Sequence, residues 1–142
     1  MIDLLNNEAW ETVNKLLAEL RQHASEGIPI IVEGKCDVSS LKKLGIEGCF
    51  HKVSNGKSLL HFVEGFSSAK KVIVLPDFDR TGDKLANFIA KHMKRSSVEP
   101  ITEFRDKLKS LVRREVKDIE GMAKFLQTQQ AQKKKVLIYF LT

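Results

Sequence analysis

Cysteine and long apolar runs are scarce in this sequence of 142 residues, and each scarcity excludes a class of protein. The two cysteines, Cys36 and Cys49, lack the close pairing of a zinc site or a disulfide framework. Because free cysteine favours buried positions, we expect both to be reduced and structural. No stretch reaches the roughly 18 consecutive apolar residues that a membrane span needs. Residues 1–7 lack the layout of a secretory signal, so the sequence predicts a cytoplasmic protein with no membrane partner.

Flexible linkers, internal repeats and clustered aromatic residues are also missing. The chain therefore suits a single domain, residues 1–142. We divide it into an N-terminal helix (1–27), a core (28–101) and a basic helical extension with an apolar tail (102–142). The few aromatic side chains form no pattern suited to stacking bases, so sequence-specific reading of a single strand is not expected.

The positive charge is confined to one part of the chain. Residues 1–90 carry 11 basic and 12 acidic side chains, whereas residues 91–142 carry 13 basic and 6 acidic ones. The whole net charge of +6 therefore comes from the last third of the sequence. Such asymmetry favours a polyanionic partner, although solvated helix faces would have the same composition.

Apolar spacing alternates between the periods of helices and of buried strands. This alternation predicts an α/β fold with a mostly parallel sheet of four to five strands, helices on both faces, and further C-terminal helices. The most apolar strand is expected at the centre. The predicted strands span residues 28–32, 49–53, 72–75 and 98–101, and the predicted helices span residues 7–25, 38–44 (capped by Asp37), 58–66, 85–93, 102–112 and 118–127.

The C-terminal tail has a composition of its own. Residues 127–135 (QTQQAQKKK) are polar and predict a connection, and residues 136–141 (VLIYFL) are apolar. Because six exposed apolar residues would be costly, we expect them to add an edge strand to this sheet or to a neighbour's. A homodimer formed through this tail is one possibility that follows.

Three carboxylates follow apolar strands directly. Glu33 ends the first strand beside Gly34, and Asp77 and Asp79 end the strand at residues 72–75. Parallel strands present such side chains at a shared crevice, where a hard divalent cation relieves their repulsion and holds phosphate. The pattern predicts that the three carboxylates converge on a magnesium site for phosphoryl transfer.

These residues resemble the Toprim domain, the catalytic module of topoisomerases, bacterial-type primases, OLD-type nucleases and the maturase of 5S ribosomal RNA. The likeness rests on Glu33 in Val-Glu-Gly-Lys and on Asp77-Phe-Asp79 followed by Gly82, and it spans residues 28–101. The segment at residues 117–120 (KDIE) also resembles small stand-alone Toprim proteins of archaea and bacteria. The resemblance implies a Rossmann-like fold and a Mg²⁺ site, with Mn²⁺ as a possible substitute.

The same resemblance implies roles for individual residues. Asp77 and Asp79 would hold the metal, and Glu33 would share it or act as general acid and base, so all three are candidate catalytic and metal-binding residues. Basic side chains near the motifs and in the C-terminal part are candidate contacts to nucleic acid, or else solvated charges. They are Lys35, Lys57, Arg80, Arg105, Lys107, Lys109, Arg113 and Arg114.

The motifs leave more than one function open. The first hypothesis is a Mg²⁺-dependent nuclease or RNA-processing factor, with RNA favoured over DNA and with an RNA-processing complex as a possible partner. The second is a non-catalytic module that binds and protects RNA. A weaker one is a haloacid-dehalogenase-like phosphatase, whose Asp-x-Asp-x-Thr motif matches residues 77–81. Those phosphatases begin with the strand that carries the motif, whereas 76 residues precede the motif here.

Overall fold

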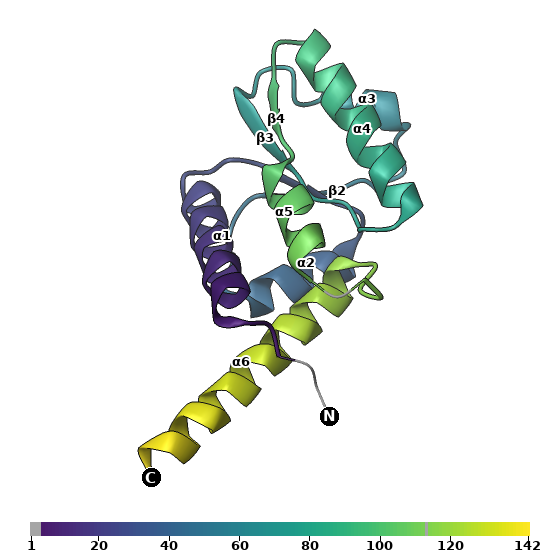
Figure 1. Cartoon of the computed structure of the whole chain (residues 1–142). Helices are drawn as coiled ribbons and strands as arrows, with labels where there is room; N and C mark the ends of the chain where they lie inside the picture. Colours follow the sequence, from purple (N-terminus) through teal and green to yellow (C-terminus); the bar gives the residue numbers. More distant parts are fainter. Residues whose placement is uncertain (1–3, 113) are drawn as a thin grey trace.

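A computed structural model describes residues 4–112 and 114–142 and contains a four-stranded sheet between two layers of helices (Figure 1). The strands pair in parallel in the order β2-β1-β3-β4. This confirms the predicted α/β class and the central position of the most apolar strand, β3. The strands are β1 (Ile30–Val32), β2 (Phe50–Lys52), β3 (Lys71–Val74) and β4 (Glu99–Ile101).

The two central strands are buried on both faces. Ile30 and Val32 of β1 belong to one apolar cluster, and Ile31 belongs to the other. In β3, Val72 and Val74 lie on the same side as Ile31. Side chains alternate across a strand, so such continuous apolar runs need helices on both faces.

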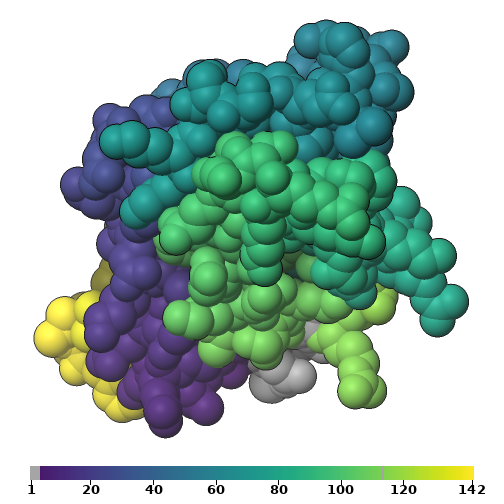
Figure 2. Space-filling view, turned by 90° about the horizontal axis from the view of Figure 1, so that it is seen from above, coloured from purple at the N-terminus to yellow at the C-terminus, as the bar shows by residue number. Residues whose placement is uncertain are grey.

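Helices pack against both faces of the sheet. On the side of Ile31 the sheet is covered by α3 (Leu59–Glu64) and α4 (Arg80–Arg95). The opposite face is covered by α1 (Asn7–Ser25), α2 (Lys35–Lys43), α5 (Glu103–Leu111) and α6 (Ile119–Leu141). Helices α1 and α5 lie side by side, purple and green in Figure 2.

Short polar side chains begin several of these helices. The side chains of Asn6, Ser58, Asp79 and Asp118 accept backbone N–H groups in the first turns of α1, α3, α4 and α6. The expectation for α2 was wrong in detail, because Gly34, not Asp37, occupies the N-cap position. Asp37 lies in the first turn, and its carboxylate accepts the Gly34 N–H at 2.9 Å.

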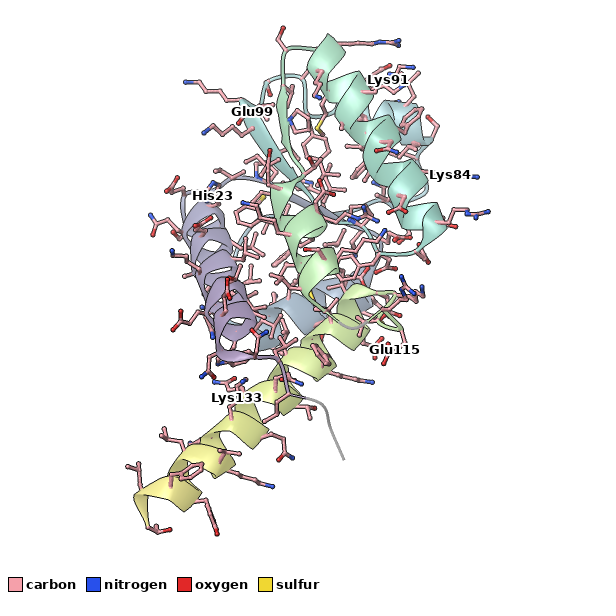
Figure 3. The ribbon with its side chains drawn as sticks, viewed as in Figure 1. His23, Lys84, Lys91, Glu99, Glu115 and Lys133 are labelled. Carbon is pink, nitrogen blue, oxygen red and sulfur yellow. The ribbon has the colours of Figure 1, made fainter. Side chains whose placement is uncertain are left out.

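The C-terminal tail is helical, which contradicts both the predicted polar connection and the predicted edge strand. Helix α6 runs unbroken from Ile119 to Leu141, because most of residues 122–135 are good helix formers and neither Gly nor Pro follows its first turn. The N-terminal segment holds its middle: Leu5 N–H donates to Gln129 at 2.8 Å, and Lys133 Nζ donates to the Leu5 carbonyl at 2.6 Å. Beyond Lys133, which Figure 3 labels, α6 projects from the body (Figures 1 and 3).

Both cysteines are exposed and free, so the expected burial was wrong. Cys36 lies in the first turn of α2, and Cys49 precedes the edge strand β2. The Cys49 Sγ atom lies 3.4 Å from His51 Nε2. Within residues 4–112 and 114–142, no helix is long and apolar enough to cross a membrane.

Candidate functional site

Glu33 and Asp77 meet at the carboxyl ends of β1 and β3. These strands are direct neighbours, so the residues that follow them lie side by side. The Asp77 N–H donates to Glu33 Oε2 at 2.7 Å, and both side chains are only partly exposed. Ser54, after β2, donates its hydroxyl to the Glu33 carbonyl at 2.8 Å. The structure thus brings together two of the three carboxylates that the sequence singled out.

Asp79 has a different environment. It is exposed and caps α4, because its Oδ1 atom accepts the Gly82 N–H at 2.7 Å. Gly82 is required here: a Cβ atom at this position would lie 1.8 Å from the Asp77 carbonyl oxygen. Among the residues that the structure describes, no group of three or more His, Cys, Asp or Glu side chains is placed to hold one metal ion. The structure therefore does not bring Asp79 into a preformed cluster with Glu33 and Asp77.

Arg105 holds the loop between β3 and α4 (residues 75–79) from the core side. Its assignment as a surface contact to nucleic acid was wrong. The side chain is buried, with Nε donating to the Pro76 carbonyl at 3.0 Å and Nη2 donating to the Asp77 carbonyl. The same Nη2 pairs with Asp83 at 2.8 Å. Hydrogen bonds from Lys109 and Arg105 lower the pKa of Asp83. All of the donors of Arg105 that are in use therefore serve the loop and the first turn of α4.

The start of α6 closes over the loop from the other side. The Ile119 N–H donates to Asp77 Oδ1 at 3.0 Å, and the Phe78 N–H donates to the Lys117 carbonyl at 2.7 Å. These contacts involve the segment at residues 117–120, which the sequence analysis noted as similar to small Toprim proteins. Its role is to position Asp77 at the amino end of a helix, where partial positive charge favours an anion.

Burial and neighbouring carboxylates make Asp77 hard to ionise. The pKa of Asp77 is raised to about 7, mainly by burial. The Ile119 N–H lowers it, whereas the charge of Glu33, a hydrogen bond with the Glu33 side chain and the charge of Asp118 raise it. The pKa of Asp37 is also raised, first by burial and then by the charges of Asp77 and Asp118. Sequence reasoning gave Asp37 and Asp118 only helix-capping or boundary roles, and their place near Asp77 depends on tertiary packing.

The donor set fits a magnesium ion held through few protein ligands. Mg²⁺ prefers oxygen, keeps several waters, and often uses one or two carboxylates together with a bound phosphate. Glu33 and Asp77 each give one carboxylate oxygen to a backbone N–H and retain a second oxygen. A dication between the two carboxylates would compensate their negative charge, which burial and mutual repulsion make unfavourable.

A basic hollow borders the loop. Its volume is about 420 Å³, and Phe78 lies in its lining together with Lys109, Arg114 and Lys117. Lys109 also pairs with Asp83 at 2.9 Å. Two of the predicted contacts, Lys109 and Arg114, therefore line the same hollow as Phe78, the residue between Asp77 and Asp79.

The other predicted contacts are dispersed over the surface. Arg80 lies in the first turn of α4 and Lys107 on α5, and both are exposed. Lys57 is exposed and borders a hollow beside His51, and Lys35 borders another beside α2. Arg113 lies outside the described residues. The additional lysines Lys84 and Lys91 of α4 point away from the sheet (Figure 3).

Comparisons with known proteins agree with this architecture. Residues 28–111, more than half of the chain, match the family model of the Toprim domain. A UPF0292 protein of Methanosarcina barkeri is 39% identical over 124 residues, covering 86% of each chain. A UPF0292 protein of Methanocaldococcus jannaschii is 35% identical over 121 residues, covering 84% of this chain and 94% of that protein. A solved structure of a protein from Aquifex aeolicus has a TM-score of 0.63 and 26% identity, covering 75% of this chain and 94% of that one.

The raised pKa of Asp77 predicts a pH-dependent effect of Asp77→Asn on stability. The folded pKa of about 7 lies above the unfolded value, which is about 3.9. The stability associated with protonated Asp77 is thus fully present below about pH 4 and is lost as the pH rises to about 7. Asparagine stays neutral and keeps an acceptor for the Ile119 N–H. In chelator-treated buffer, the melting temperature of the variant should exceed that of the wild type only slightly near pH 4.5. The difference should grow with pH and become constant above about pH 7. After solvent screening it should correspond to about 1 kcal/mol, or roughly 3–6 °C.

Glu47→Gln serves as the matched control, because Glu47 is an exposed carboxylate in the loop before β2. It should show no such pH-dependent gain. A melting difference for Asp77→Asn that stays constant from pH 4.5 to 8 would contradict the proposed environment of Asp77.

Proposed function

The chain belongs to the Toprim domain family, which indicates a nucleic-acid-associated, metal-dependent function, and on that premise we propose a specific activity. The protein is a Mg²⁺-dependent nuclease or RNA-processing factor of the cytoplasm that acts on phosphodiester bonds and prefers RNA to DNA. The observation that carries the proposal is the contact between Glu33 and Asp77 at the carboxyl edge of the sheet, next to a basic hollow.

The residues have distinct roles in this proposal. Glu33 and Asp77 hold the ion, which supplies charge stabilisation at the scissile phosphate when bound. The second carboxylate oxygen of Glu33 can also hold or move a proton at the reacting oxygen. Asp79 is a third candidate ligand once its carboxylate turns partly from the cap. Arg105 positions the Asp77 main chain, while Arg114 and Lys117 bind the phosphates that flank the reacting one.

A non-catalytic RNA-binding module is the second candidate, and the engagement of Asp79 favours it. Its carboxylate already caps α4, and the described residues contain no cluster of three metal ligands. A site with two carboxylates could bind Mg²⁺ and a phosphate without cleaving the chain. Such a module would protect RNA or serve in an RNA-processing complex, and cleavage assays separate the two functions.

We expect Mg²⁺ to stabilise the wild-type protein at pH 8 by binding Glu33 and Asp77. At ten times its dissociation constant, an ion that binds only the folded state adds about 1.4 kcal/mol, or roughly 4–8 °C in melting temperature. The increase should be absent in Glu33→Gln and Asp77→Asn and present in the control Glu47→Gln. Equal increases in all four proteins would contradict the metal assignment.

Cleavage of labelled RNA and DNA with Mg²⁺ or Mn²⁺ tests the catalytic part. Wild-type protein should cut RNA faster than DNA, and Glu33→Gln and Asp77→Asn should lose at least about two orders of magnitude, the typical contribution of a positioned acid or base. Binding of RNA without cleavage, or equal cleavage by the variants, would leave the non-catalytic module as the function.

The basic hollow should contribute salt-dependent binding. Arg114→Ala combined with Lys117→Ala removes two charges and should lower the slope of log affinity against log salt by about 1.4 for a single strand. The matched control is Lys70→Ala with Lys71→Ala, which removes two exposed charges at the amino end of β3. A salt slope equal to that of the control would exclude the hollow from the interface.

The exposed end of α6 supports the predicted homodimer. Six apolar residues at positions 136–141 are between 44% and 79% exposed, and a second copy packed against them would remove this surface from water. Light scattering should therefore give a dimer for the wild type and a monomer for Tyr139→Lys with Phe140→Glu, with the same far-ultraviolet circular dichroism. A monomeric wild type across the micromolar range would contradict this proposal.

A further inference from the structure

A second basic groove lies on the opposite side of the carboxylate pair, between α2 and the edge strand β2. Its volume is about 510 Å³. Lys35, Ser39 and Lys42 follow one another at helical spacing, so they form one stripe of α2. Phe50 and Lys52 are two positions apart on β2 and therefore share a face of the strand. The groove thus has a basic wall from each element and an aromatic ring between them.

The charge of this groove is not compensated by the residues that the structure describes. Lys35, Lys42 and Lys52 are exposed, and none of them forms an ion pair with a carboxylate within residues 4–112 and 114–142. The described residues that line the groove include no acidic side chain. Three unpaired ammonium groups around one hollow attract a polyanion and repel other basic surfaces.

The groove begins close to the proposed active site, both in the sequence and in the order of the strands. Lys35 is two residues from Glu33 and occupies the first turn of α2. Strand β2 lies next to β1, which ends in Glu33, whereas the basic hollow borders Phe78, which follows β3. The two basic surfaces therefore lie on either side of the carboxylate pair along the strand order. A chain crossing the pair from the hollow would reach the groove next.

Phe50 indicates the form of nucleic acid. The ring packs partly against the core cluster and is partly exposed at the groove. A base can stack on such a ring only when it is not paired inside a duplex, and stacking tolerates any base. The lysines around the ring would contact the phosphates on each side of that base.

We infer that this α2–β2 groove binds a single-stranded segment of the nucleic acid on which the Glu33–Asp77 site acts. Lys35, Lys42 and Lys52 bind the phosphates, and Phe50 stacks on one base. The inference rests on the proposed function, because it assigns the path of the same substrate.

The test compares wild type with the triple variant Lys35→Gln, Lys42→Gln and Lys52→Gln. The probes are a labelled oligouridylate, an oligodeoxythymidylate of the same length, and a blunt duplex, each titrated at several salt concentrations without Mg²⁺. For both single strands the variant should lower the salt slope by about 2 and the affinity at 0.1 M salt by roughly 30- to 100-fold. Duplex affinity should change no more than it does in the control.

The control is Lys15→Gln, Lys70→Gln and Lys71→Gln, which removes the same charge from exposed positions on α1 and at the amino end of β3. A second variant, Lys42→Gln with Lys52→Gln, leaves Lys35 beside Glu33 unchanged and should still lower single-strand affinity. Phe50→Leu should weaken single-strand binding roughly five- to hundredfold while Phe50→Tyr retains it, because only the leucine removes the ring.

The outcomes separate the groove from the function on which it depends. Single-strand affinity equal to that of the control, or an equal loss for the duplex, overturns the groove assignment, and the Mg²⁺-dependent melting shift would then still support the proposed function. Failure of the wild type to bind any of the three probes overturns both. Wild-type binding that falls only in the groove variants, with the Mg²⁺ shift retained, establishes the groove.

Discussion

The buried guanidinium of Arg105 fixes the main chain on which the candidate site depends. It holds the carbonyl groups of Pro76 and Asp77 from the core side, while Ile119, at the start of α6, binds the Asp77 carboxylate from the other side. These contacts join segments separated by 28 and 42 positions in the sequence. Together with the pairing of β1 and β3 and the hydrogen bond from the Asp77 N–H to Glu33, they hold the Asp77 carboxylate next to Glu33 against the repulsion between two acids. The C-terminal elements are therefore part of the site's framework.

Holding Glu33 and Asp77 together is electrostatically unfavourable, and this unfavourable pair lies where the catalytic step is proposed. Burial is the main cause that raises the pKa of Asp77 to about 7, and the nearby charges of Glu33 and Asp118 add to it. Folding tolerates the arrangement because the surrounding core is large and apolar on both faces of the sheet. A bound dication would remove the same cost, so the stability lost in assembling the pair becomes a driving force for metal binding. This is the usual relation between local strain and function in an active site.

The sequence was sufficient for the features that depend on local pattern. Short apolar runs ending in acids predicted the parallel strands and the meeting of Glu33 with Asp77, since neighbouring parallel strands end at one edge. The features that failed depend on long-range contacts. In the sequence, Arg105 cannot be distinguished from a surface arginine. Only the folded structure reveals that its N–H groups bind the Pro76 and Asp77 carbonyls and Asp83. Likewise, the polar residues 127–135 predicted a connection because their contact with the N-terminal segment, through Gln129 and Lys133, is invisible in local sequence.

The distribution of charge along the sequence did not predict where basic surfaces form in the folded protein. The excess of basic residues after residue 90 directed attention to the C-terminal part, yet a groove with three unpaired lysines is formed by α2 and β2, where the sequence is nearly neutral. Neutrality along the chain does not mean neutrality in space, because the acids of the same segment lie elsewhere: Glu33 and Asp37 face the site and Glu47 lies outside the groove lining. Folding thus places the carboxylate pair at the sheet edge, with an excess of bases on either side, although Asp106 also lines the hollow. A polyanion held over a carboxylate pair requires this arrangement, since the flanking bases must supply the attraction that the acids oppose.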